Sequence, residues 1–145
     1  TGSWVHTGEG GLAPYHTEGG GDVIMQIGSG IFGVRNVDGT FSWEKFKEKA
    51  KNPQVACFEI KLAQGAKIRG GHVEGSKVNE EIASIRGVEP WKTVDSPNRH
   101  KQFNDLPSLF DFIERLFDQR IGWDTFFNER NITCGRKCKG MLLCK

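Results

Sequence analysis

The amino-acid sequence predicts a parallel α/β fold. Two short strand-like segments, residues 22–27 and 55–63, are interleaved with helix-like segments in the order strand, helix, strand, loop, helix, long loop, helix. This order is typical of parallel α/β architecture more than of a sandwich. The second strand runs directly into a glycine turn that carries two lysines and a glutamine. Because α/β enzymes bind ligands where their strands end, this turn is the first candidate for a functional site.

The first strand and the first helix follow from local signals. Residues 22–27 form a short apolar run that predicts a buried strand, and Asp38 with Gly39 marks a turn. Ser42 is suited to cap a helix that ends at Asn52 and Pro53. The expected apolar face of this helix consists of Trp43, Phe46 and Ala50.

The second strand has one apolar and one charged face. Its two-residue period places Phe58, Ile60 and Leu62 on one side and Cys57, Glu59 and Lys61 on the other. In a parallel barrel the apolar side would lie under helices, and Lys61 would reach the mouth at the carboxyl ends of the strands. A half-solvated antiparallel strand with Glu59 and Lys61 in water fits the same pattern, so the segment alone leaves both interpretations open.

Two more helices are expected after a loop at residues 64–76. One begins near Asn79, with Ile82 and Ile85 on its apolar side. Residues 87–104 are polar and irregular, and Pro107 then opens the most strongly amphipathic helix. Its apolar positions are Leu106, Leu109, Phe110, Ile113, Leu116 and Phe117. After Gln119 no further apolar strand is expected.

Composition excludes several classes of protein. The chain has 145 residues, of which 37% are hydrophobic and 26% charged, as in an ordinary globular unit. A net charge of +2 without a basic stripe argues against nucleic acid as a partner. No apolar run reaches the roughly eighteen residues of a membrane span, and no leader pattern occurs at the start, so we expect no membrane association and a cytoplasmic location.

The cysteines do not predict a metal site. Cys57 is expected to be a small buried side chain in the second strand. Cys134, Cys138 and Cys144 crowd the last part of the chain, but their spacing matches none of the common structural zinc patterns. We therefore assign no metal ligands.

Gly28, Gly30 and Gly33 match the spacing of a dinucleotide-binding loop but not its context. Such a loop should open a helix whose N-terminus holds a pyrophosphate. Residues 34–40 lead into a turn instead, so a nicotinamide-binding unit is not expected.

Polar donors gather around the end of the second strand and the loop after it: Lys61, Gln64, Lys67, Arg69 and Arg86. Together they would attract an anionic ligand. Solvated surface charges are the alternative interpretation. The four histidines are scattered along the chain, and none of them is assigned as a general base.

Four motifs make the sequence specific. They are Thr7-Gly-Glu-Gly-Gly11, Gln26-Ile-Gly-Ser-Gly-Ile-Phe-Gly-Val34, Glu59-Ile-Lys-Leu-Ala-Gln-Gly-Ala-Lys67 and Lys77-Val-Asn-Glu-Glu-Ile-Ala-Ser-Ile-Arg86. In this order they resemble the FMN-binding synthase domain of glutamate synthases, over about residues 4 to 118. Residues 89–92 and 96–100 add a resemblance to the short, glutamate-synthase-like branch without a fused amidotransferase domain.

The resemblance implies a fragment of a (β/α)₈ TIM barrel with FMN across the carboxyl-end mouth. In the family, reduced FMN passes a hydride to 2-iminoglutarate, formed from 2-oxoglutarate and ammonia, to give L-glutamate. NADPH or ferredoxin donates the electrons, and an amidotransferase supplies the ammonia. The implied cofactor-binding residues are Glu9, Gln26, Lys61 and Gln64; the implied substrate-binding residues are Lys67 and Arg86; the implied catalytic residues are Lys61 and Lys67.

The sequence also departs from the family pattern. Ile68 to His72 stands where the larger enzymes have a proline and a glycine-rich segment, which leaves the substrate open. A complete barrel needs about 250 residues, so we expect residues 1–119 to be a partial barrel domain and residues 120–145 not to be family sequence. The iron-sulfur cysteines of the full-length family are not reproduced. A fragment inactive on its own, or a non-catalytic anion- or nucleotide-binding remnant, are the alternatives.

Overall fold

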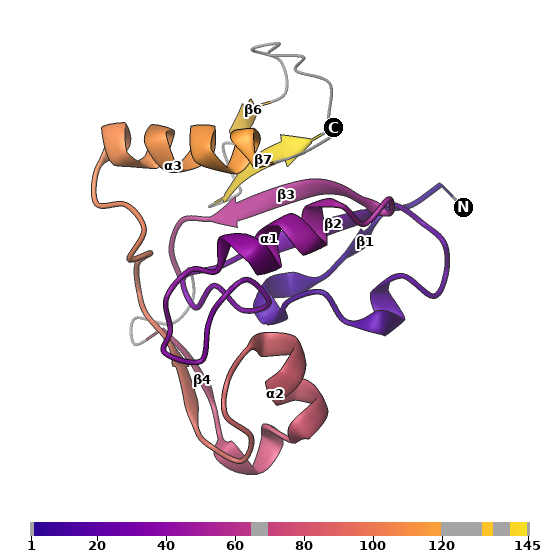
Figure 1. Ribbon diagram of the computed structural model, residues 1–145, viewed down its shortest axis with the longest axis vertical. Coiled ribbons are helices and arrows are strands. Elements are labelled where there is room, and N and C mark those ends of the chain that lie inside the picture. Colours follow the sequence, from indigo (N-terminus) through magenta and orange to yellow (C-terminus); the bar gives the residue numbers. More distant parts are fainter. Residues whose placement is uncertain (1, 65–69, 120–131, 135–139, 145) are drawn as a thin grey trace.

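The part of the chain that the structure describes forms a small mixed α/β fold with two sheets and three α-helices (Figure 1). The computed structural model describes residues 2–64 and 70–119, and the backbone of residues 132–134 and 140–144. The larger sheet has the order β1-β2-β3-β7-β6. Its strands are β1 (Val5–His6), β2 (Val23–Ile27), β3 (Val55–Lys61), β7 (Gly140–Cys144) and β6 (Ile132–Cys134).

β2 and β3 are parallel, as the order of segments predicts, and β1, a strand that the sequence did not predict, is parallel to β2. β1 pairs with β2 and β2 with β3, each in parallel, and α1 (Trp43–Ala50) lies in the connection between β2 and β3. Parallel neighbours require such a crossover connection. Their carboxyl ends therefore meet at one edge of the sheet, where β3 ends at Lys61.

Strands that the sequence did not predict extend this arrangement. β7 pairs antiparallel with β3 and with β6, although no strand was expected after Gln119. β4 (Gly71–Val73) and β5 (Val94–Ser96) form a separate antiparallel ribbon in segments expected to be irregular. Three residues are too few to show a period of two, which is why pattern alone missed β4, β5 and β6.

The two faces of the parallel strands differ as predicted. Phe58 and Ile60 are buried in the main core, and Leu62 packs against it from a partly buried position. Glu59 and Lys61 lie on the opposite, polar face, while Cys57 is buried, as expected. The alternation therefore separates a core from a site on the two sides of one sheet.

Helices α1 and α3 (Leu106–Asp118) cover the apolar face. Phe46 and Ala50 of α1 join the core together with the buried side of α3, and the N-caps Ser42 and Asp105 accept hydrogen bonds from Lys45 and Ser108 backbone amides. The buried side of α3 consists of Leu109, Phe112, Ile113 and Leu116. The prediction was wrong for Leu106 and Phe110, which are exposed, because the helix turns Phe112 toward the core instead.

Helix α2 (Glu80–Arg86) lies apart from α1 and α3, beside the β4–β5 ribbon (Figure 1). It begins at the predicted position, where the Asn79 side chain accepts from the Ile82 amide at 2.8 Å. Ile82 and Ile85 are only partly buried, and Ala83 is the buried residue of its apolar side. Gly87 ends the helix in the left-handed conformation, with φ of 73°.

Residues 96–100 bring the chain from the ribbon back to the end of β3. Ala63 and Arg99 form an isolated antiparallel bridge. The His100 ring is 3% exposed, and its Nε2 lies 2.8 Å from the Lys61 carbonyl oxygen, to which it donates. A face of the same ring stacks on Phe103, with 4.8 Å between the ring centroids. Burial lowers the pKa of the His100 imidazole below its ordinary value, so the neutral ring is favoured.

We expect Gly87→Ala to lower the free energy of unfolding by about 1–3 kcal/mol. A side chain would be strained at this φ, and its Cβ would lie 2.7 Å from the Arg35 carbonyl oxygen. Urea unfolding followed by circular dichroism measures the change. Gly19→Ala is the matched control, since nothing lies within 4 Å of a Cβ at Gly19. Equal effects of both substitutions would contradict the prediction.

We also expect the protein to lose stability as the pH falls from 6.5 toward 5. The unfolded chain binds a proton at His100 near the ordinary value of 6.5, whereas the lowered pKa of the folded state delays protonation, so unfolding is favoured progressively below that pH. The pKa of His16 is lowered by burial in the same direction, so only the difference between wild type and His100→Gln reports on His100. Thermal melts at pH 5 to 8 should show a flatter profile for the variant; identical profiles would refute the assignment.

Candidate functional site

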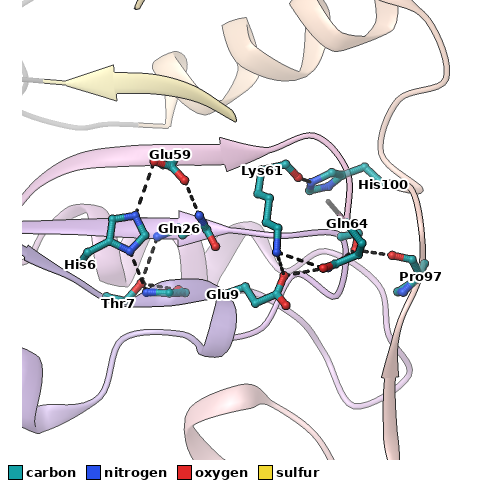
Figure 2. Close-up of polar contacts among 11 residues, drawn as sticks. His6, Thr7, Glu9, Gln26, Glu59, Lys61, Gln64, Pro97 and His100 are labelled. Carbon is teal, nitrogen blue, oxygen red and sulfur yellow. Dashed lines mark hydrogen bonds and ion pairs between the residues drawn. The ribbon is translucent and has the colours of Figure 1, made fainter. Parts of the chain in front are cut away.

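The candidate site lies at the carboxyl ends of the three parallel strands, on the polar face of the sheet. Figure 2 shows Glu9, Lys61 and Gln64 converging there from different parts of the chain. Glu9 lies in a short 3₁₀ helix, Gly8–Gly10, that follows β1. Lys61 is the last residue of β3, and Gln64 lies three residues later. The parallel topology, and not nearness in sequence, brings Glu9 to the other two.

These three side chains form a closed triangle of hydrogen bonds. Lys61 Nζ lies 3.0 Å from Glu9 Oε2 and 3.0 Å from Gln64 Oε1, and Gln64 Nε2 donates to Glu9 Oε2 at 2.8 Å. A carboxylate only accepts and an ammonium only donates, so the orientation of the Gln64 amide is fixed by its two neighbours. The predicted residues Glu9, Lys61 and Gln64 are thus assembled into one unit.

Glycine at position 28 makes room for the triangle. A Cβ there would lie 2.7 Å from Glu9 Oε2 and 3.0 Å from Glu9 Cβ. The residues after it form turns, and no helix occurs within residues 28–41, so the motif leads into a turn, as predicted. The glycine-rich motif serves close approach of the Glu9 side chain instead.

Ser29 links the triangle to the segment at residues 96–100. Its hydroxyl accepts from Gln64 Nε2 at 3.2 Å and donates to the Pro97 carbonyl oxygen. Ser29 is 4% exposed, so its hydroxyl is held away from water. Neither Ser29 nor His100 was predicted as a site residue, because their roles depend on contacts between distant segments. The available signals were the motifs that contain them, Gln26 to Val34 for Ser29 and Ser96 to His100 for His100.

Gln26 occupies a deeper position on the same face. In the register of β2 and β3 it lies opposite Glu59, which is two residues before Lys61 in β3. Its side-chain Nε2 donates to Glu59 Oε1, and its backbone amide donates to Thr7 Oγ1 at 3.1 Å. His6 Nε2 lies 3.5 Å from Glu59 Oε2. Figure 2 shows this second group beside the triangle.

Arg86 is near the triangle but not part of it. Its guanidinium lies 5.1 Å from the centre of the Phe32 ring, and it would be 3.7 Å from a Cβ at Gly10. No ion pair to Arg86 occurs among the residues that the structure describes. Arg86 and Glu9 both line a pocket of about 350 Å³, together with Gly10, Gly11 and residues of α2. A further pocket of about 400 Å³, lined by Lys45 and Ser84 among others, contains none of the triangle residues.

Other predicted groups lie outside this description. Lys67 and Arg69 fall outside the described residues. The side chains of Cys134, Cys138 and Cys144 do so as well. Within the described part of the chain, no three His, Cys, Asp or Glu side chains gather as metal ligands. None of the helices described there combines the length and apolarity that crossing a membrane requires.

The arrangement is suited to holding an anionic or electron-rich group. Lys61 has a 25% exposed side chain, so the ammonium is partly desolvated but reachable. An ammonium has three hydrogens, and Glu9 and Gln64 use two of them. One donor is left for an acceptor on a ligand.

Comparison with known proteins gives a consistent picture. The family described as a conserved region in glutamate synthase matches residues 1–125. The glutamate synthase large subunit-like protein YerD of Bacillus subtilis (strain 168) is 60% identical over 117 residues, which are 81% of this chain and 22% of that protein. An archaeal glutamate synthase [NADPH] of Methanocaldococcus jannaschii is 32% identical over 116 residues, 79% of this chain and 20% of the relative.

A ferredoxin-dependent glutamate synthase of Antithamnion sp. is 38% identical over 96 residues, which cover 66% of this chain and 5% of the relative. The chain therefore spans about a fifth or less of the length of these relatives. The matched residues include all four motifs that carry the sequence resemblance. On this evidence the chain belongs to the glutamate synthase family.

Proposed function

We propose that this chain carries part of the flavin site of an FMN-dependent oxidoreductase of the glutamate synthase type. The proposed reaction is the reductive amination of 2-oxoglutarate to L-glutamate through 2-iminoglutarate. A longer enzyme would catalyse it, and this chain would supply one part of that enzyme. The observation that carries the proposal is the Lys61 ammonium, held by Glu9 and Gln64 at the carboxyl ends of three parallel strands. Flavin barrels bind their ligands at this edge of the sheet.

The proposed architecture is a segment of a (β/α)₈ barrel within residues 1–119. The parallel order β1-β2-β3 and the helices α1 and α3 on the apolar face support it. In a barrel the polar face, with Lys61, is the interior. Because β7 is antiparallel to β3, the barrel proposal depends on the first three strands alone. Residues 120–145 are proposed to lie outside this domain.

The residues present fit FMN. Bound FMN supplies hydride transfer, and a cation beside the pyrimidine edge stabilises the negative charge of the reduced ring. In this proposal Lys61 is that cation, and its third hydrogen, used by neither Glu9 nor Gln64, is available to the ligand. Glu9 and Gln64 hold the ammonium in place, and Gln26 contributes a side-chain amide one layer deeper, oriented by Glu59.

Arg86 and Lys67 are proposed to bind the carboxylates of 2-oxoglutarate. A guanidinium can make a paired hydrogen bond to a carboxylate, and Arg86 has no competing acidic partner among the described residues. Arg86 and Glu9 line the same pocket, which supports binding of a substrate carboxylate near the triangle. Electrons come from NADPH or ferredoxin in this proposal, as the names of two relatives say of those proteins. Ammonia comes from an amidotransferase partner.

Titration of the chain with FMN, followed by flavin fluorescence, tests the proposal. We expect Lys61→Met to weaken binding by about ten- to a hundredfold, since a hydrogen bond to a charged group contributes about 1.5–3 kcal/mol. Lys92→Met is the matched control, because Lys92 is an exposed lysine that pairs with Glu89. Equal affinities of the two variants would contradict a flavin-facing Lys61. Binding of inorganic phosphate without any binding of FMN would support a non-catalytic anion-binding remnant instead.

A further inference from the structure

We infer that His100 is a positioning residue for Lys61 and Gln64. The inference rests on the proposed function, in which Lys61 faces the ligand. His100 touches neither Glu9 nor the ligand side of Lys61; it acts on the backbone from which the two side chains project. Figure 2 shows the His100 ring beside the Lys61 backbone and joined to it by a dashed line, while the Lys61 side chain extends away toward Glu9 and Gln64.

The hydrogen bond from His100 fixes the last peptide group of β3. Lys61 is the last residue of the strand, where the regular ladder of the sheet stops. The His100 Nε2 hydrogen is donated to the Lys61 carbonyl oxygen at 2.8 Å. This bond sets the plane of the peptide after Lys61, and therefore both the direction of the Lys61 side chain and the path of the chain toward Gln64.

The ring is itself held rigidly. His100 is 3% exposed and stacks on Phe103 with an angle of 23° between the ring planes. Phe103 in turn lies 5.8 Å from Phe112 in the core, measured between ring centres. A buried imidazole N–H without an acceptor would be costly, so burial of the ring stabilises its hydrogen bond to the Lys61 carbonyl oxygen. His100 thus transmits the rigidity of the core to the end of β3.

Two further contacts tie residues 96–100 to the same place. Ala63, the residue before Gln64, forms a bridge with Arg99. Ser29 donates to the Pro97 carbonyl and accepts from Gln64. The segment therefore holds the turn at three points, and His100 supplies the one that acts on Lys61.

A double-mutant cycle tests this inference. The variants are His100→Phe, which keeps the flat ring but removes the donor, and Lys61→Met, alone and combined. We expect His100→Phe to weaken FMN binding about two- to tenfold, the range of one lost hydrogen bond. In the Lys61→Met background it should have no further effect, because its action passes through Lys61.

His100→Gln should restore most of the affinity, since its amide can donate to the same carbonyl oxygen. Leu116→Val is a control for loss of stability alone, because Leu116 is fully buried in α3 and distant in sequence from the site. It should leave FMN binding unchanged at temperatures where it is folded. An equal loss of affinity from His100→Phe with and without Lys61 would overturn the inference and leave a purely structural role.

A second measurement keeps the inference testable if the wild-type chain does not bind FMN, which would count against the proposed function and not against His100. Acetic anhydride labelling of the ligand-free chain, read by mass spectrometry, reports how firmly Lys61 is held. Lys61 should react about two- to tenfold faster in His100→Phe than in wild type, relative to Lys92, and at the wild-type rate in His100→Gln and Leu116→Val. An unchanged rate in His100→Phe would overturn the inference.

Discussion

The ion pair between Lys61 and Glu9 is the interaction on which the site depends. Its two ends come from β3 and from the loop after β1, and it forms only because β1, β2 and β3 are parallel and end at one edge. Gln64 closes the triangle and Gly28 leaves room for it. Partly exposed ion pairs contribute little to stability, about 1 kcal/mol or less. The value of this pair lies in holding an ammonium with one free donor at a fixed place.

The sheet divides structure from chemistry. Its apolar face packs under α1 and α3 and provides the rigidity, while the polar face carries two groups of side chains, one around Lys61 and one around Glu59. The segment at residues 96–100 connects these two functions, since it packs on the core through Phe103 and reaches the end of β3 through His100. Loss of the contacts that join Phe112, Phe103 and His100 can therefore alter the end of β3 without involving a ligand-facing residue.

The sequence predicted the elements that have a clear period and missed those that depend on distant contacts. The strand at residues 55–63, the cap at Ser42 and the helix that begins near Asn79 were predicted, and the structure has β3 at Val55–Lys61, the cap and the helix. The family resemblance implied that Glu9, Lys61 and Gln64 share one site, and their side chains lie together. The strands β1 and β4 to β7 were missed, because they are short or pair with distant segments. His100 and Ser29 carry no periodic signal. Only the fold shows that they contact the end of β3 and Gln64.

A crystal structure of this chain with bound FMN would show whether Lys61 contacts the flavin. We expect the pyrimidine edge of the flavin to lie about 3 Å from Lys61 Nζ, with Glu9 and Gln64 still bound to the same ammonium. A flavin seated in the pocket beside Lys45 and Ser84, with Lys61 making no contact to it, would contradict a flavin-facing Lys61.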